Sequence, residues 1–555
     1  MADKIQIILY RIFQVLISVF FAVVCVSQIL GVFGLYQATL VFVLSIVLFG
    51  AVLFFWWKAT PLEPQEDAGT SDRKRIELAG YLGGVILLTL LLGALSRWPA
   101  FALPWDAGEY HYTKAAELFR TGSANDFTIS YGDYPFGYES ILSFGLLLAK
   151  DLAIYGLLHV FIALLFVLAL WALAKKYSSL PVGLLFFIII FLCLSGLIPF
   201  FNPWNSLYLT IFTVGKNDLM LAAATIAAIA FSRFGLDKTK SHDLMGLSLA
   251  TAIGMSVKPN STLIFLLLWA DVLVFEWRQK TTVKTLFMKL LSYGVICLTG
   301  VIWLFRNLIG FSAFFDPNSY RIVSWSIWSN LLNPDFYLHI PKSLLLVAAV
   351  LVLSIGLSFL KLFRKFLWRE SLLFAVLLLS FMITPASAAQ NDPSQVAWRF
   401  GTALLVQEFC LLLLIADKLL VAMLKWVIER KFAVYAASAV ILLVAAGFFV
   451  WQADLLRAVP GNAWPLYRSY KDNDAPYLSV FDYIDENIHD AVIWVEGSQS
   501  HYAYDPDFTN SVTRSEPADY IVAVNRTIDD LWITEDEWEV LYQDRYGTIY
   551  QRKGE

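Results

Sequence analysis

Residues 12–32 read IFQVLISVFFAVVCVSQILGV, an apolar run without a charged side chain. A run of about 20 apolar residues is long enough to cross the roughly 30 Å hydrocarbon core of a bilayer as a helix. The run is too long for the core of a signal peptide and lacks a small-residue cleavage site, so we expect it to be retained. Its apolar residues do not alternate with polar ones, which favours a membrane helix over a barrel strand.

The rest of the chain repeats this pattern. Of its 555 residues, 58% are hydrophobic and only 15% are charged, so most of the chain would be insoluble as a globule in water. The composition therefore predicts a polytopic α-helical membrane protein. The net charge of −4 and the scattered basic residues give no indication of a nucleic-acid partner. The four cysteines each lie alone in an apolar run, which is typical of packing residues: Cys25, Cys193, Cys297 and Cys410.

The positions of Lys and Arg predict how the helices are oriented, because basic residues collect at cytoplasmic ends. Residues 361–369 form the clearest basic cluster and should be cytoplasmic. Counting outward from this anchor gives about 11 full crossings, with the amino terminus inside and the carboxyl terminus outside. Residues 58–78 then form a flexible cytoplasmic linker loop, and residues 98–135 form the first large extracytoplasmic loop.

Two apolar segments do not fit complete crossings. Residues 244–275 must begin and end on the same side, which predicts two short helices that meet at Lys258-Pro259, since proline breaks a helix. This is a re-entrant pair. The run 136–149 spans only roughly 21 Å as a helix, so we expect it to enter the membrane without crossing.

The composition divides the chain at residue 452. Residues 1–451 form the transmembrane domain, and residues 452–555 are predicted to form a small extracytoplasmic α+β domain. A helical pattern follows Pro476, residues 491–495 and 520–524 resemble strands, and residues 538–551 suggest a hairpin that turns near Arg545. A structural or acceptor-positioning role fits this domain, since it contains no nucleotide, nucleophile or zinc motif.

The first large outer loop contains the segment Leu103–Tyr112, which is acidic and rich in aromatic residues. A carboxylate of Asp106 at the membrane edge is suited to act as a general base that takes the proton from an acceptor hydroxyl. The alternative is that Asp106 caps a helix that starts at Ala107, a position that aspartate favours. Three neighbours supply further acidic, aromatic and hydrogen-bonding groups for a substrate site: Glu109, Tyr110 and His111.

Four basic residues are candidates for binding an anionic leaving group: Lys258, Arg306, Arg399 and Lys216. Lys258 is the most informative, because an ammonium within a re-entrant apolar segment is costly unless it has a partner or ligand. Lys216 has an alternative role as half of an interfacial pair with Asp218. Arginine at a membrane edge is also common, so Arg306 and Arg399 have the same structural alternative.

The order of these segments resembles the GT-C superfamily of polytopic membrane glycosyltransferases, in the branch with protein O-mannosyltransferases and aminoarabinose transferases. The resemblance covers nearly the whole chain and is carried by these motifs: Asp106 followed by Tyr110, Tyr134-Pro135 opening a short helix, Lys258-Pro259, Trp303-Leu304-Phe305-Arg306-Asn307, and a terminal domain that begins Tyr477-Leu478-Ser479-Val480-Phe481 and ends in a hairpin.

The resemblance implies transfer of a hexose or pentose from a polyprenyl-phosphate donor, with inversion, at the extracytoplasmic face of a bacterial inner or plasma membrane. The acceptor class stays open among glycan, lipid and protein. Asp106 matches the family's catalytic acid, and Lys258, Arg306 and Arg399 become candidate partners of the donor phosphate. Many relatives place a second acid directly after the first, whereas Ala107 and Gly108 intervene here. The role of Glu109, and a divalent Mg or Mn ion held by Asp106 and Glu109, therefore stay open.

Two other functional classes compete with this one. A transporter also has broken helices and membrane charges, but the two halves of this chain contain no matched pair of interrupted segments. A non-catalytic membrane assembly protein fits the 16% aromatic content as well as a sugar-binding enzyme does, because Trp and Tyr line any membrane interface.

Overall fold

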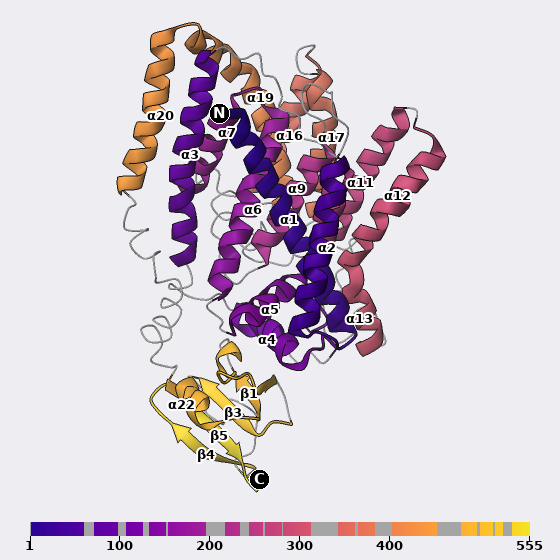
Figure 1. Ribbon diagram of the computed structural model, residues 1–555, viewed down its shortest axis with the longest axis vertical. Coiled ribbons are helices and arrows are strands. Elements are labelled where there is room, and N and C mark those ends of the chain that lie inside the picture. Colours follow the sequence, from indigo (N-terminus) through magenta and orange to yellow (C-terminus); the bar gives the residue numbers. More distant parts are fainter. Residues whose placement is uncertain are drawn as a thin grey trace.

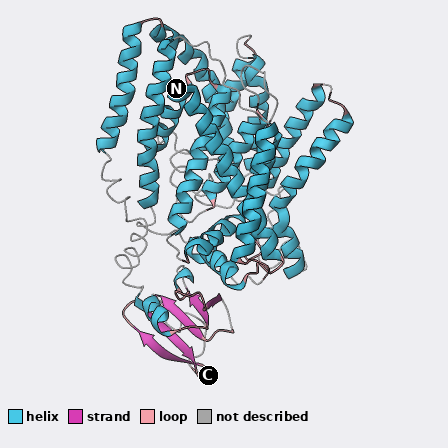
Figure 2. Cartoon of the chain, in the orientation of Figure 1, coloured by secondary structure: helices cyan, strands magenta, loops and turns pink. Residues whose placement is uncertain are grey.

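The computed structural model describes residues 2–59, 71–97, 107–125, 132–150, 154–195, 217–233, 243–258, 261–279, 281–311, 342–360, 364–382, 402–451, 479–496, 500–513, 517–524 and 536–554. These residues form a body of helices and a small sheet near the carboxyl terminus (Figure 2). A helical membrane body followed by a small α+β unit confirms the predicted fold class.

The described helices of the body follow one another along the chain in a simple order. They are α1 (Ala2–Val32), α2 (Ala38–Ala59), α3 (Ser71–Arg97), η2 (Ala107–His111), α4 (Tyr112–Thr121), α5 (Gly137–Ala149), α6 (Ile154–Tyr177), α7 (Val182–Ser195), α9 (Asp218–Ser232), α10 (Leu244–Val257), α11 (Ser261–Arg278), α12 (Val283–Leu298), η4 (Thr299–Val301), α13 (Ile302–Phe311), α16 (Lys342–Ser358), α17 (Arg364–Met382), α19 (Thr402–Ile428) and α20 (Lys431–Trp451). Among the described residues, five helical segments are long and apolar enough to cross a membrane.

Helix α9 lies at the centre of the helical body (Figure 1). All 15 of its residues are buried, and its sequence DLMLAAATIAAIAFS is rich in alanine. In lipid there is no hydrophobic driving force between helices, so their association depends on close packing. Small side chains allow the helix backbones to approach closely enough for that packing. Helices α6 and α10 pack directly against α9 in this way. The Asp218 end of α9 is thereby held beside the other elements of the candidate site.

Helices α3 and α7 also depend on small residues. Gly80 of α3 lies against the main chain of Gly183, and a Cβ atom on Gly183 would overlap the carbonyl oxygen of Glu77. Glycine is required at this crossing because any larger side chain would force the two helices apart. The contact packs α3 closely against α7.

The two helices predicted to meet at Lys258 are present as α10 and α11. Asn217, at the start of α9, donates from Nδ2 to the carbonyl oxygen of Val257 at 3.3 Å. At the opposite end of α9, Arg233 forms an ion pair with Asp271 of α11. The two helices therefore run out and back along α9, and the break at Lys258 lies beside the start of α9.

The linker predicted over residues 58–78 is too long. Helix α2 continues to Ala59 and α3 already begins at Ser71, with Asp72 in its first turn. An acidic residue stabilises the amino-terminal end of a helix through the helix dipole, so this polar stretch is helical despite its charge. Residues 60–70 lie outside the described residues.

The tail unit has the predicted strands and one that was not predicted. Its elements are α22 (Ser479–Asn487), β1 (Val492–Glu496), η8 (Ser500–Tyr502), β2 (Ser511–Thr513), β3 (Tyr520–Val524), β4 (Trp538–Gln543) and β5 (Gly547–Arg552). The sheet order is β2-β1-β3-β5-β4, with β1 parallel to β2 and β3 and the β4–β5 hairpin antiparallel. The unpredicted strand β2 forms one edge of the sheet.

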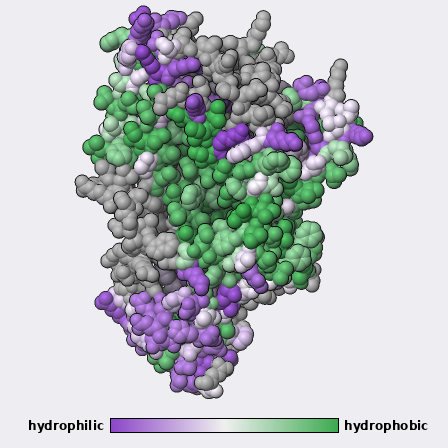
Figure 3. Space-filling model, viewed as in Figure 1, coloured by the Kyte–Doolittle hydropathy of each residue, from purple (hydrophilic) through white to green (hydrophobic). Residues whose placement is uncertain are grey.

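The surface divides in the same way. Figure 3 shows apolar residues over the sides of the helical body and hydrophilic residues over the tail unit. Helix α12, for example, has no buried residue, and Phe287 and Leu298 are exposed. Apolar side chains of this kind are suited to contact lipid, as expected for a helix at the edge of a membrane protein.

Candidate functional site

The candidate site is built around η2 and α4, at the end of the helical body nearest the tail unit (Figure 1). The segment starts as a π-helical turn at Ala107, as expected if a helix begins after Asp106, and continues as α4. It ends at Gly122, whose φ of 70° lets its N–H bond to the carbonyl oxygen of Leu118 at 3.0 Å. Glycine is favoured there because an L side chain is strained at that φ.

A buried acid–base pair joins this segment to α5. Nδ1 of His111 lies 2.7 Å from Oε1 of Glu139, and the two side chains are only 1% and 2% exposed. Glu139 belongs to the first turn of α5, where a carboxylate is favoured by the helix dipole. The carboxylate of Glu139 fixes the orientation of the buried His111 ring, so the pair is suited to hold or move a proton.

Lys114 lies one helical turn after His111 and is fully buried. Burial lowers the pKa of Lys114 to about 8, while the nearby carboxylates of Glu139 and Asp133 favour its charged form. Its Nζ also lies 5.8 Å from the centre of the Tyr110 ring. The charge of a buried ammonium is thus stabilised by nearby carboxylates within electrostatic range.

Arg306 of α13 adds a second buried cation near Lys114 and Glu139. Its Nη1 donates to the carbonyl oxygens of Ala124 and Gly132 at 3.3 and 2.6 Å, and its Nη2 donates to that of Tyr134 at 2.8 Å. The side chain is fully buried. Arg306 therefore braces the chain on both sides of residues 126–131 and places a fixed positive charge beside Asp133. We name His111, Lys114, Asp133, Glu139 and Arg306 the charged cluster.

The Lys258–Asp218 ion pair adjoins the charged cluster. Lys258 has a side chain that is 13% exposed, whereas Asp218 is 1% exposed. Gly137, at the start of α5, lies directly against Ser256 near the end of α10, so a Cβ on Gly137 would collide with that serine. Asp218 is also within electrostatic range of the Tyr138 hydroxyl. The helix break at Lys258 therefore lies against the first turn of α5, which carries Glu139.

The predicted site residues are only partly described. Asp106, Lys216 and Arg399 lie outside the described residues, and nothing is described of the Glu109 side chain. The structure brings His111, Tyr110 and Arg306 together and places Lys258 beside them. Asp218 forms an ion pair with Lys258, and the alternative Lys216–Asp218 pair falls on a residue outside the described ones.

A divalent ion is the cofactor that the sequence left open. Within the described parts of the chain, no three His, Cys, Asp or Glu side chains gather in a group that would hold a metal ion. His111 and Glu139, which are metal-ligand types, are hydrogen-bonded to each other. The described residues thus provide no cage for a divalent ion, and the predicted ligands Asp106 and Glu109 are not among the described side chains.

Sequence reasoning missed three members of this site: Lys114, Asp133 and Glu139. A signal was present for Glu139, because a lone carboxylate at the start of an otherwise apolar helix is costly unless it is paired. Lys114 gave no comparable signal, since lysine in a mixed polar helix is usually exposed. The tail residues that contact α4 were missed as well.

Comparisons with known proteins give a structural likeness. No protein-family model matches the chain, and no curated protein matches it. The fold is similar to a crystal structure of ArnT from Cupriavidus metallidurans bound to undecaprenyl phosphate, with 13% sequence identity and a TM-score of 0.47, over 84% of this chain and 97% of that chain. At this identity and TM-score the likeness assigns no function to the present chain.

Proposed function

We propose that this chain is a membrane glycosyltransferase that moves a sugar from a polyprenyl-phosphate donor to an acceptor at the extracytoplasmic face. The observation that carries the proposal is the charged cluster itself. It buries two fixed cations, two carboxylates and an imidazole at the end of a bundle of apolar helices. Charged side chains in such a setting are costly, and they mark substrate and proton pathways in membrane proteins.

The location of the cluster supports a donor that is part lipid and part anion. The apolar helix faces provide a route for an isoprenoid chain, and Lys258 is the most exposed of the three cations near the cluster. Arg306 and Lys114 are fully buried. Main-chain carbonyl oxygens bind Arg306, and Lys114 lies within electrostatic range of Glu139 and Asp133. We therefore assign Lys258 to the donor phosphate and give Arg306 and Lys114 the role of holding the site around it.

In the proposed reaction, the acceptor oxygen attacks the anomeric carbon of the sugar while the bond from that carbon to the phosphate oxygen breaks. The electron pair of the broken bond leaves with the phosphate, where the Lys258 ammonium stabilises the developing negative charge. Asp106, directly before η2, accepts the proton of the acceptor hydroxyl. Attack from the side opposite the phosphate inverts the anomeric configuration.

Lys258 provides a test with a matched control. Lys258→Met should lower donor turnover by on the order of 100-fold, because removal of one donor to a developing oxyanion typically has this effect. The control is Lys289→Met, which breaks the Lys289–Glu276 ion pair at 2.9 Å on the α11–α12 hairpin, away from the site. Transfer of radiolabel from a polyprenyl-phosphate sugar pool in proteoliposomes measures both variants.

Asp106 provides the second test. Asp106→Asn keeps the size and shape of the side chain but removes the base, so transfer should be lost while binding of undecaprenyl phosphate is retained. Full transfer by this variant would show that Asp106 is not the base. Absence of label transfer by the wild-type protein from every polyprenyl-phosphate sugar supplied would refute the proposed function.

A further inference from the structure

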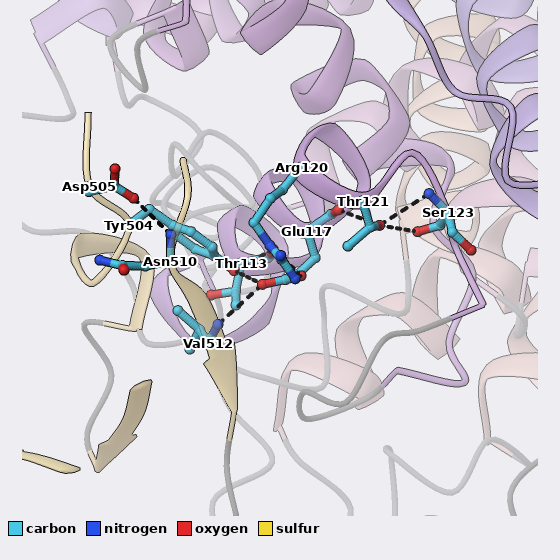
Figure 4. Close-up of polar contacts among 9 residues, drawn as sticks. All are labelled: Thr113, Glu117, Arg120, Thr121, Ser123, Tyr504, Asp505, Asn510 and Val512. Atoms are coloured by element: carbon cyan, nitrogen blue, oxygen red, sulfur yellow. Dashed lines mark hydrogen bonds and ion pairs between the residues drawn. The ribbon is translucent and has the colours of Figure 1, made fainter. Parts of the chain in front are cut away.

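The tail unit contacts α4 through hydrogen bonds to the carboxylate of Glu117. Oε1 of Glu117 accepts hydrogen bonds from the Tyr504 hydroxyl at 2.8 Å and from the Val512 main-chain N–H at 3.2 Å. Oε2 accepts from Nε and Nη2 of Arg120 at 3.2 and 2.7 Å. Figure 4 shows these bonds converging on Glu117 from the tail and from α4 itself. Both oxygens of a carboxylate that is 4% exposed are thus used.

Further contacts run along the same side of η2 and α4. The Tyr504 hydroxyl also lies 3.3 Å from the Thr113 carbonyl oxygen, and the rings of Phe508 and Phe119 meet edge to face at 5.1 Å. His501 meets the Tyr112 ring edge to face at 5.4 Å. The turn η8, which carries His501, therefore lies against η2 and the start of α4.

The part of the tail that makes these contacts is internally braced. Oδ1 of Asp505 accepts from the main-chain N–H groups of Thr509 and Asn510 at 2.7 and 2.8 Å. Nδ2 of Asn510 donates to the carbonyl oxygen of Ile488 at 2.8 Å, which ties the turn to the end of α22. We name residues 500–513 the tail loop. Its shape is set by the tail, so it meets α4 as a preformed surface.

Helix α4 is thereby held from two sides. His111 and Lys114 face Glu139 and the rest of the charged cluster, while Thr113 and Glu117 face the tail loop. Any motion of the tail loop away from α4 frees one side of the segment that begins directly after Asp106. The placement of η2 and α4 thus includes a contact between distant parts of the sequence.

We propose that the tail loop is a positioning element of the transferase, with Tyr504 and Glu117 as the positioning residues that hold η2 and α4, and with them Asp106, in their reactive placement. This role rests on the proposed function and deepens it. A misplacement of about 1 Å at a catalytic group costs on the order of 100-fold in rate, so a docking contact of this kind affects turnover directly.

The test uses Tyr504→Phe in the full-length protein, because this variant removes one hydroxyl and keeps the ring stacked on Phe508. The matched control is Tyr542→Phe, on the β4 strand, whose ring stacks on Tyr483 within the tail. Three quantities are measured: hydrogen exchange of the amides of residues 107–121, the number of undecaprenyl-phosphate binding sites per protein, and turnover per binding site.

Tyr504→Phe should speed amide exchange in residues 107–121 and lower turnover per binding site by on the order of 10- to 100-fold, with the number of binding sites unchanged. Loss of correctly folded protein would instead lower the number of sites and leave turnover per site intact. Glu117→Ala should act in the same direction, because it removes the acceptor of the Tyr504 and Val512 hydrogen bonds. The effects of Glu117→Ala and Tyr504→Phe should be less than additive in the double variant, since the two residues share the Tyr504–Glu117 bond.

Unchanged turnover per site in Tyr504→Phe, together with normal activity of the wild type, would overturn the positioning role and leave the proposed function standing. A wild-type protein that transfers no sugar from any donor would overturn both. The positioning role would also be overturned if the Tyr542→Phe control turned over as slowly as Tyr504→Phe. The effect would then not come from the contact of the tail loop with α4.

Discussion

Acidification from about pH 7.5 to about pH 5 should loosen the tail loop from α4, because His501 is buried there in its neutral form. His501 is 2% exposed, and neither of its ring nitrogens has a side-chain hydrogen-bond partner among the described residues. Its neighbours are the Tyr112 and Tyr502 rings and the Gly108 main chain. Burial lowers the pKa of His501 from 6.5 to about 3. None of these neighbours carries a charge that would stabilise an imidazolium.

The size of the effect follows from this pKa difference. The pKa of His501 is lower when the loop is docked, so the docked state is favoured fully above pH 6.5 and loses stability as the pH falls from 6.5 toward 3. Each pH unit in this window is worth about 1.4 kcal/mol. At about pH 5 the loss is roughly 2 kcal/mol, or on the order of 30-fold in the docking equilibrium.

Hydrogen exchange of the amides of residues 107–121 measures this loosening, with the rates corrected for the intrinsic effect of pH. His501→Phe keeps an aromatic ring against Tyr112 but cannot be protonated, so its exchange should be the same at both pH values. His489→Gln is the matched control, because His489 is half-exposed and lies beside Asp505 within the tail. Equal corrected exchange of the wild type at the two pH values, or an acid response that survives in His501→Phe, would refute the reasoning.

Two further predictions concern stability. Arg306→Lys should destabilise the protein by roughly 3 kcal/mol, because a lysine cannot donate to the carbonyl oxygens of Gly132 and Tyr134 together and leaves a buried carbonyl without a donor. The thermal unfolding midpoint in detergent measures this loss. Gly183→Ala should cost about 1–3 kcal/mol, because its Cβ would clash with the α3 main chain. Gly447→Ala, which has open space around it within α20, should not lower the unfolding midpoint, because alanine favours a helix more than glycine does.

Much of the fold was predictable from the sequence because membrane helices follow from local composition. The apolar run 136–149 corresponds to α5, which begins one residue later, and the run 12–32 lies within α1. The helix break at Lys258 was predictable for the same reason, since proline acts on its immediate neighbours. The errors arose where local signals were weak. Strand β2 has only three residues, and the start of α3 is too polar to be recognised as part of an apolar helix.

The candidate site was less predictable, because its contacts join distant parts of the chain. Glu117 accepts from Tyr504, 387 positions away, and Arg306 bonds to Gly132, 174 positions away. From the sequence alone, Glu117 and Arg120 form an ordinary (i, i+3) pair on an exposed helix face, which contributes little to stability. In the structure, the tail loop covers Glu117 and hydrogen-bonds to it, so the carboxylate becomes a buried contact between the tail and α4. The candidate base was found from its local setting at the membrane edge, whereas the residues proposed to hold it could be found only from the fold.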